Sequence, residues 1–219
     1  MRLHSAVSLS SILVVVGLSA LQPPLAAQYQ QASRARLYES WENDRVRVRK
    51  ISVAPGAEMP AQTDSDRVLV YLTADLQNRM PAAEAVWQPA GARETNLGKF
   101  NVEAIAIELK NAPATDSGIT PLEALPSTGL VDGHVLIDNP RVVVTKLRYF
   151  QNSYAGAWHS HPQDAVIVYL RGGYTWVPTA GWDTYRVRRG DIDVLPANTI
   201  HTFGNPGGDP LEFLAIFPK

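Results

Sequence analysis

Short runs in which apolar and polar residues alternate follow one another along most of the chain, and Pro, Gly, Asn and Asp separate them. Such alternation is typical of β-strands with one buried face. No long segment has the 3.6-residue period of a helix, and "PAAEAVW" is too short to form one. The pattern therefore predicts an all-β sandwich or barrel. The predicted strands lie within "VRVRKISVAPG", "RVLVYLTA", "VEAIAIELK", "HVLIDNPRVVVTKLRYF", "AVIVYLRGG", "TYRVRRGDIDVLPAN" and "LEFLAIF".

The chain contains two divergent copies of one sequence pattern. "ENDRVRVRKISVAPGAEMPAQTDSDRVLVYLTA" resembles "IDNPRVVVTKLRYFQNSYAGAWHSHPQDAVIVYLRG", and "VEAIAIELK" parallels "LEFLAIFPK". "WQPAGARETNLG" likewise parallels "VLPANTIHTFGN". Residues 111–133 are rich in Pro, Thr, Ser and Gly, which favours a linker. We expect one β-unit over residues 28–110 and a second over residues 134–219.

The N-terminal residues have the pattern of a targeting segment. Arg2 supplies a positive charge, and the apolar stretch 9–21 is shorter than the ~20 residues of a membrane span. "PLAAQ" offers small residues for cleavage after Ala27. We expect residues 1–27 to be a signal peptide and the mature protein to be secreted or periplasmic, with no membrane association. An uncleaved anchor helix is the alternative.

Composition restricts the chemistry. The chain has no cysteine, so thiolates cannot hold a metal, and any ligand must be His, Asp or Glu. Twenty Lys and Arg balance 21 Asp and Glu without a basic cluster, which argues against a nucleic-acid partner.

Four of the five histidines lie in the second unit, and three of these have an informative spacing. His159 and His161 are one residue apart, so a strand would place both imidazoles on one face. His201 follows about forty residues later, after a predicted strand and a Pro-containing turn. Neutral imidazoles suit Zn, Cu, Fe and Ni, so the three could form a divalent-metal site. His134, beside the linker, is expected to be a solvated loop residue.

These residues resemble the two sequence motifs of the cupin family. The first motif has the pattern G-x5-H-x-H-x3,4-E-x6-G, and the second G-x5-P-x-G-x2-H-x3-N. They fall on Ser153, His159, His161 and Gly172, and on Gly190, Pro196, Asn198, His201 and Asn205. The resemblance implies two jelly-roll (double-stranded β-helix) cupin barrels in tandem. It also implies one divalent ion (Fe, Mn, Ni or Zn) in the second barrel, with His159, His161 and His201 as its ligands.

The second unit departs from the motifs at three positions, the first being Ser153 in place of the leading glycine. Asn198 replaces the turn glycine, and asparagine tolerates the positive φ that this turn needs. Ala165 replaces the glutamate ligand, which leaves three histidines and no carboxylate. A local bulge could turn Asp164 inward as a substitute. Otherwise Asp164 is expected to be a rim carboxylate in water.

The first unit has no histidine within residues 28–110. Met59 and Ala61 stand at the positions of His159 and His161, so the unit is expected to be a degenerate cupin barrel without metal. Glu58 and Glu94 are expected to be solvated, a second acidic site being the alternative.

The resemblance implies a metal-dependent enzyme, of the dioxygenase type or related, that acts on a small chelating oxyacid or diketone, and the N-terminal pattern adds that it is exported. A non-catalytic module that binds or senses a metal or small ligand is the alternative, because no general acid or base stands out. Strand parity places Tyr169 on the inward face with Ala165, which makes Tyr169 and Arg171 candidates for substrate contact. Trp158 is expected to face away. A homodimer is also expected by analogy.

Overall fold

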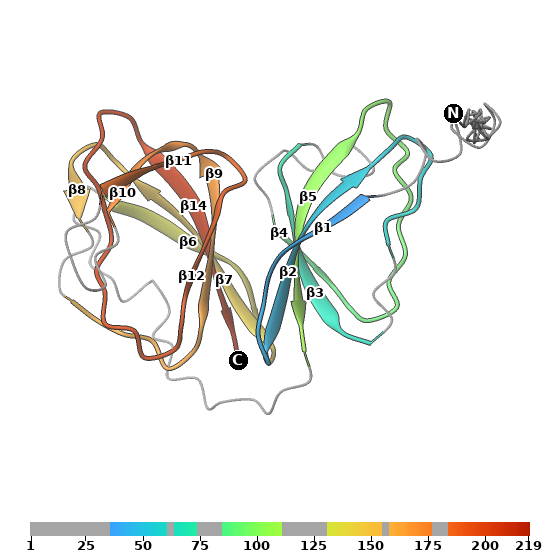
Figure 1. Ribbon diagram of the computed structural model, residues 1–219, viewed down its shortest axis with the longest axis horizontal. Helices are drawn as coiled ribbons and strands as arrows, with labels where there is room; N and C mark the ends of the chain where they lie inside the picture. Colours follow the sequence, from blue (N-terminus) through green and yellow to red (C-terminus); the bar gives the residue numbers. More distant parts are fainter. Residues whose placement is uncertain (1–35, 61–63, 74–84, 111–130, 155–157, 177–183) are drawn as a thin grey trace, which may run out of the picture. The chain divides into compact units, whose positions relative to one another are not determined.

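The computed structural model describes residues 36–60, 64–73, 85–110, 131–154, 158–176 and 184–219 (Figure 1). These residues form antiparallel strands and contain no helix, so the all-β prediction is confirmed. Among the residues so described, no helix is long and apolar enough to cross a membrane. The expected signal peptide lies outside the described residues.

The N-terminal half contributes one five-stranded sheet in the order β1-β2-β5-β3-β4. Alternation along β2 divides its side chains between two faces, with Val46 and Val48 on one and Ile51 and Val53 on the other. The strands are β1 (Arg36–Glu42), β2 (Val46–Val53), β3 (Asp66–Tyr71), β4 (Ala85–Gln88) and β5 (Val102–Leu109).

The C-terminal half contributes two sheets, a five-stranded one in the order β12-β9-β14-β7-β6 and a four-stranded one in the order β11-β10-β13-β8. The first contains β6 (Val131–Asn139), β7 (Val142–Tyr149), β9 (Ala165–Arg171), β12 (Ile192–Leu195) and β14 (Leu211–Pro218). The second contains β8 (Ser153–Tyr154), β10 (Gly173–Trp176), β11 (Thr184–Val187) and β13 (Gly204–Asn205).

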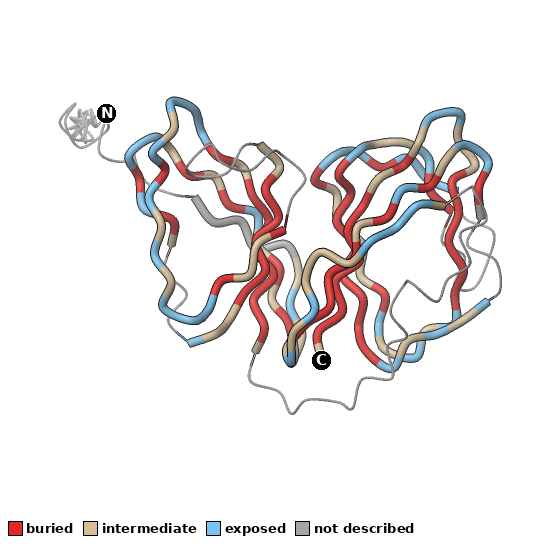
Figure 2. The backbone as a smooth tube through the Cα atoms, turned by 180° about the vertical axis from the view of Figure 1, so that it is seen from behind, coloured by how far each residue is buried: buried red, intermediate tan, exposed pale blue. Residues whose placement is uncertain are grey.

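Three clusters of buried side chains form the core. Figure 2 colours the backbone of buried residues red. One is confined to the N-terminal half and one to the C-terminal half. The third contains residues of both halves, such as Val68 and Val70 of β3 with Val166 and Val168 of β9. Each half therefore buries one face of its strands within itself and the other in a core that the two halves share.

The repeated turns of the two halves have matching hydrogen bonds. Asn96 and Asn205 each donate through the side-chain amide to backbone carbonyls and accept a bond from the glycine two residues later. Gly91 and Asn198 have positive φ angles of 77° and 62° in matching turns. The expectation that asparagine preserves the altered turn is therefore confirmed.

Two details of the linker region differ from the sequence analysis. Strand β6 begins at Val131, so residues 131–133 of the expected linker are part of a sheet, while residues 111–130 lie outside the described residues. His134 is exposed, but it lies in β6 opposite Lys146 and not in a loop. The alternation of "VDGHVLID" is weak because exposed residues interrupt it, which explains the wrong prediction.

Candidate metal centre

His159, His161 and His201 converge in the C-terminal half. Each offers a ring nitrogen, and these three atoms all lie within 4.8 Å of one another. The ring centroids are 4.9 Å apart for His159 and His161, 4.5 Å for His159 and His201, and 5.3 Å for His161 and His201. Among the described residues, no other group of His, Asp or Glu side chains meets this proximity.

Backbone hydrogen bonds join the two segments that carry the histidines. His159 and His201 form an isolated antiparallel bridge with N–O distances of 2.9 and 2.8 Å. The amide of Asn198 donates to the carbonyl of His161 at 2.7 Å, and the amide of Thr199 closes the turn on Pro196 at 3.1 Å. The distance between the histidine segments is thus fixed by the backbone, before any ion is bound.

The ring of His201 is held by its own turn. Its Nδ1 lies 2.9 Å from the carbonyl oxygen of Thr199, which can only accept a hydrogen bond. When the ring is neutral, this bond places the proton on Nδ1 and leaves the lone pair on Nε2. A backbone partner of this kind is the usual way in which a protein orients a histidine ligand.

The environment keeps His161 and His201 neutral. Burial, together with the neighbouring His159 and His201, lowers the pKa of His161 to about 4. Burial also lowers the pKa of His201, although its bond to Thr199 acts in the opposite direction. Neutral imidazoles at physiological pH are what a metal ion requires, since a protonated ring cannot ligate.

The histidines open into a cavity of about 70 Å³ that is otherwise almost wholly apolar. That volume holds a few water molecules or a ligand of a few non-hydrogen atoms. Apart from the histidines, the only polar side chain that the described residues add to the wall is Tyr149, and burial raises the pKa of its hydroxyl. The lining consists of Leu147, Tyr149, His159, His161, Ala165, Ile167, Leu195, His201, Phe203, Phe213, Ala215 and Phe217.

The structure answers the question of the missing carboxylate. Ala165 lines the cavity, so the position of the family's glutamate faces the histidines without offering a ligand. Asp164 does not replace it, and it is not a solvated rim residue either. It is 7% exposed, accepts the amide of Ala197 at 2.9 Å and accepts the side-chain amide of Asn43 at 2.6 Å. Asp164 therefore ties the turn before His201 to the N-terminal half, a contact across 121 residues that local sequence cannot reveal.

The two residues proposed for substrate contact lie apart from the histidine cavity. Tyr169 faces the interior with Ala165, as parity predicted, but it is fully buried and donates a hydrogen bond to Asp193 at 2.6 Å. Arg171 is exposed at the end of β9. Neither lines the cavity. Trp158 is 51% exposed, as expected for a side chain that faces away.

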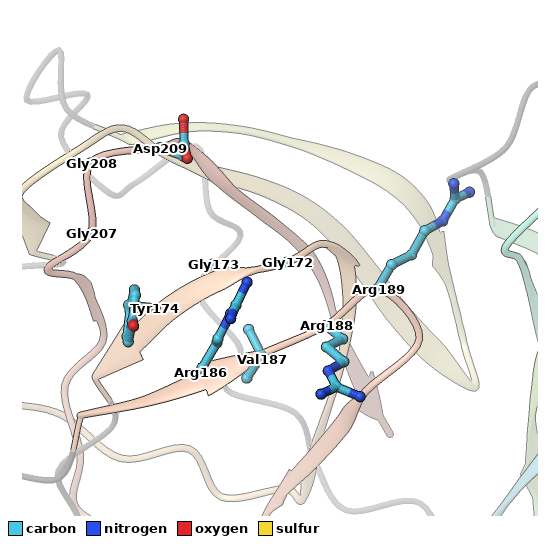
Figure 3. Close-up of a pocket in the computed structure, with 10 residues that line it drawn as sticks. All are labelled: Gly172, Gly173, Tyr174, Arg186, Val187, Arg188, Arg189, Gly207, Gly208 and Asp209. Carbon is cyan, nitrogen blue, oxygen red and sulfur yellow. The ribbon is translucent and has the colours of Figure 1, made fainter.

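A larger open groove of about 560 Å³ lies elsewhere on the C-terminal half (Figure 3). Glycines 172, 173, 207 and 208 form much of its wall, and Arg186, Arg188 and Arg189 supply positive charge. In Figure 3 these three guanidinium groups point in different directions and do not converge on one point. The smaller histidine cavity, not this groove, gathers the groups able to perform metal chemistry.

Glu58 and Glu94 do not form a second acidic metal site. Glu58 is 49% exposed and lies 3.8 Å from Arg93, and Glu94 accepts a hydrogen bond from Tyr71 at 3.2 Å. Neither belongs to a metal-like cluster of the described residues.

Comparison with protein families identifies residues 148–217 as a match to the cupin domain model. This segment contains all three histidines. No curated protein matches the sequence significantly.

Solved structures share the fold at low sequence identity. A cupin 2 conserved barrel domain protein from Leptotrichia buccalis covers 84% of this chain and 89% of its own, with 16% identity and a TM-score of 0.59. Oxalate decarboxylase from Lactobacillus farciminis, solved as a formate complex, covers 84% and 80%, with 13% identity and a TM-score of 0.59. A mutant of salicylate 1,2-dioxygenase from Pseudoaminobacter salicylatoxidans covers 80% and 71%, with 10% identity and a TM-score of 0.59. These likenesses concern the fold.

Proposed function

Because this chain belongs to the cupin superfamily and brings three imidazoles together at one cavity, we propose that it binds a divalent metal ion through His159, His161 and His201. The proximity of the three ring nitrogens is the observation that carries the proposal. Ligand nitrogens at about 2.1 Å from one ion are roughly 3 to 3.4 Å apart, depending on the coordination geometry. Nitrogens that already lie within 4.8 Å need only small side-chain rotations to reach that spacing.

The donor set suits Fe, Mn, Ni or Zn and leaves coordination positions for a ligand. Three neutral imidazoles do not reduce the double charge of the ion, so the site favours an anionic ligand with oxygen donors. When bound, the metal would act as a Lewis acid or, as iron, support oxygen chemistry. The small apolar cavity would exclude bulk water from such a ligand.

We assign the site to a small oxyacid or diketone, within a metal-dependent oxidoreductase of the dioxygenase type. His201 is oriented by Thr199, and the aromatic wall of Phe203, Phe213 and Phe217 would pack against the carbon skeleton. Tyr149 is the one hydroxyl group in the described part of the wall that could donate a hydrogen bond to the ligand. Two of the structural relatives, a dioxygenase and a decarboxylase, bear names consistent with acidic substrates.

A non-catalytic metal-binding or sensing module is the second candidate. It is favoured by the cavity wall, to which the described residues contribute no carboxylate that could transfer protons. Both candidates require the metal, and only the enzyme requires turnover.

Further parts of the proposal rest on the sequence and on the fold. The N-terminal pattern supports export through a signal peptide over residues 1–27, to the periplasm or beyond. The matched turns of the two halves support a tandem pair of barrels, with boundaries near 28–110 and 134–219 and the metal in the second. A homodimer is proposed by analogy alone.

Metal analysis of the purified protein tests the proposal. We expect about one ion per chain, and we expect His201→Ala to lose it. His134→Ala is the matched control, because His134 is exposed and distant in sequence from the motif. Retention of the metal by His201→Ala would show that the ligands are misassigned. Oxygen uptake by the iron-loaded protein with a diketone panel then separates the enzyme from the binder.

A further inference from the structure

We propose that the N-terminal half binds a small oxyanion at Arg67 and Gln88. The two side chains are 2% and 3% exposed, so both are buried inside a half that has no histidine. This inference does not depend on the metal, because it concerns a different set of residues in the other half.

These residues occupy the place that corresponds to the wall of the histidine cavity. Arg67 pairs with Gln88 across β3 and β4, as Ala165 pairs with Leu195 across β9 and β12. Both Ala165 and Leu195 line the cavity. The same backbone positions therefore carry apolar side chains in one half, and a guanidinium and an amide in the other.

The third position of the set is also polar in the N-terminal half. Glu108 of β5 pairs with Arg67 of β3. In the other half, the pair Ile216 and Val166 ends the ladder of β14 with β9. The next residues beyond that pair are Phe217 and Ala165, which therefore correspond to Glu108 and Arg67. Glu108 is 2% exposed, whereas its counterpart Phe217 packs on His161 with ring centroids 4.8 Å apart. A change from alanine, leucine and phenylalanine to arginine, glutamine and glutamate replaces an apolar wall with hydrogen-bonding groups.

Arg67 forms no ion pair among the described residues, although Glu108 faces it in the ladder and attracts its charge. Its Nε donates to Oε1 of Gln88 at 2.8 Å and its Nη1 to the carbonyl of Pro60 at 2.8 Å, and both acceptors are neutral. Glu108 balances this charge only in part, because its carboxylate is shared with Arg47 at 3.6 Å and Arg49 at 3.5 Å and forms no ion pair with Arg67. Burial lowers the pKa of Arg67, and the neighbouring Glu108 offsets this only in part. A buried, unpaired guanidinium is costly, so proteins supply it with an anion.

Two buried nitrogens remain for such an anion. Nη2 of Arg67 and Nε2 of Gln88 are buried and have no hydrogen-bond partner within the described part of the chain, and Oε2 of the facing Glu108 likewise has none. Nη2 lies on the same edge of the guanidinium as Nε, and Nε binds the amide oxygen of Gln88. The two unpaired donors therefore belong to side chains in direct contact. Carboxylates and tetrahedral oxyanions share the oxygen acceptors that such donors bind.

Anion titration of the full metal-free chain tests the inference. The probes are sodium acetate and sodium sulfate at constant ionic strength, with sodium chloride as reference. We expect a saturable rise of the melting temperature and saturable heat in calorimetry with at least one of the two anions. Acetate alone would identify a carboxylate ligand, and sulfate alone a tetrahedral one. Salting out by sulfate raises stability without saturation and equally in all variants, so it is distinguished from binding.

Variants locate the site. Gln88→Leu installs the residue of the other half and is expected to weaken anion binding at least tenfold. Arg67→Met keeps an unbranched side chain but removes the guanidinium group, and it is expected to abolish anion binding. Arg93→Met, at an exposed arginine, is the control that keeps binding. Absence of saturable binding to either anion, or binding that survives Arg67→Met, would overturn the inference without affecting the histidine site.

Discussion

Exchanging Asn43 and Asp164 tests whether their hydrogen bond holds the turn before His201 to the N-terminal half. Asn43 uses its side-chain oxygen to accept the amides of Arg45 and Val46 at 2.9 and 2.8 Å, and its amide nitrogen to donate to Asp164 at 2.6 Å. Its orientation is thereby fixed, because a flip of the amide group would break both turn bonds. The pair therefore has one polarity, which can be reversed only by changing both residues.

The expected energies follow from this arrangement. Asp164→Asn can keep the bond from Ala197, but it opposes two amide groups, so it loses one charge-assisted bond, about 2 kcal/mol. Asn43→Asp keeps the turn bonds but opposes two carboxylates. Like charges 4 Å apart repel by about 4 kcal/mol at an effective dielectric constant of 20, and proton uptake relieves part of this, so about 2 kcal/mol is expected. The double variant restores a donor on 164 and an acceptor on 43, so it should come within about 1 kcal/mol of the parent.

Urea unfolding of the metal-free protein at pH 7, followed by tryptophan fluorescence, measures these differences. The cycle should give a coupling free energy of about 3 kcal/mol. A double variant no more stable than the weaker single variant would refute the proposed polarity. Asp164→Ala also removes the acceptor for Ala197, and it should lower zinc affinity 10- to 100-fold, as the loss of a residue that supports metal ligands does.

Expectations are also defined at three other places, namely His161, Asn198 and the pair Gly172 and Gly173. The pKa of His161 is about 4 in the folded protein and about 6.5 in the unfolded chain. Between pH 4 and pH 6.5 the unfolded chain therefore binds more protons than the folded protein does. The free energy of unfolding of the metal-free protein should fall as the pH decreases from 6.5 to 4. The loss of stability is at most about 3 kcal/mol, and solvent screening of the partly exposed ring makes it smaller. The pH dependence should be weaker in His161→Gln. Chemical unfolding at several pH values measures both. Asn198 has a φ of 62°, which glycine adopts without strain. Asn198→Gly should therefore preserve or raise the melting temperature, whereas Asn198→Ala should lower the free energy of unfolding by about 1 kcal/mol. Equal effects of the two substitutions would argue against backbone strain. Gly172→Ala places a Cβ 2.8 Å from the backbone oxygen of Val187, so it should lower the free energy of unfolding by about 1–3 kcal/mol. In Gly173→Ala the Cβ lies 3.5 Å from a methyl group of Leu211, and the loss should be smaller. Thermal denaturation of the two variants measures the difference.

Strand parity and local spacing were sufficient for much of the candidate site. His159 and His161 lie one residue apart, and the predicted turn at Asn198 returns His201 to them, so their convergence follows from short-range pattern. The inward direction of Tyr169 also follows from the alternation of β9. What such patterns cannot supply is the partner of each side chain, which is why Tyr169, bonded to Asp193, does not line the cavity as a substrate contact would.

The roles of Asp164 and Arg67 could not be predicted, for a physical reason. Charged residues are usually exposed, so the sequence alone predicts that an Asp or Arg side chain is solvated. Asp164 is buried beside Asn43, 121 residues earlier, which supplies a donor, and Arg67 is buried beside Gln88 and Glu108 of the strands that flank its own. Such burial depends on tertiary pairing. The weak alternation at the start of β6 likewise concealed that this strand begins at Val131, before His134.

The two halves show which residues determine the fold and which determine the chemistry. Asn96 and Asn205 perform the same backbone capping, and Gly91 and Asn198 adopt the same turn, although the halves share few other side chains at these turns. Residues that satisfy backbone groups must keep their chemistry, since an unpaired buried amide or carbonyl is costly. The wall of the interior cavity has no such obligation. Divergence at Arg67 and Ala165 therefore left the strand pairing intact, and it gave one half a site suited to cations and the other a buried cation of its own.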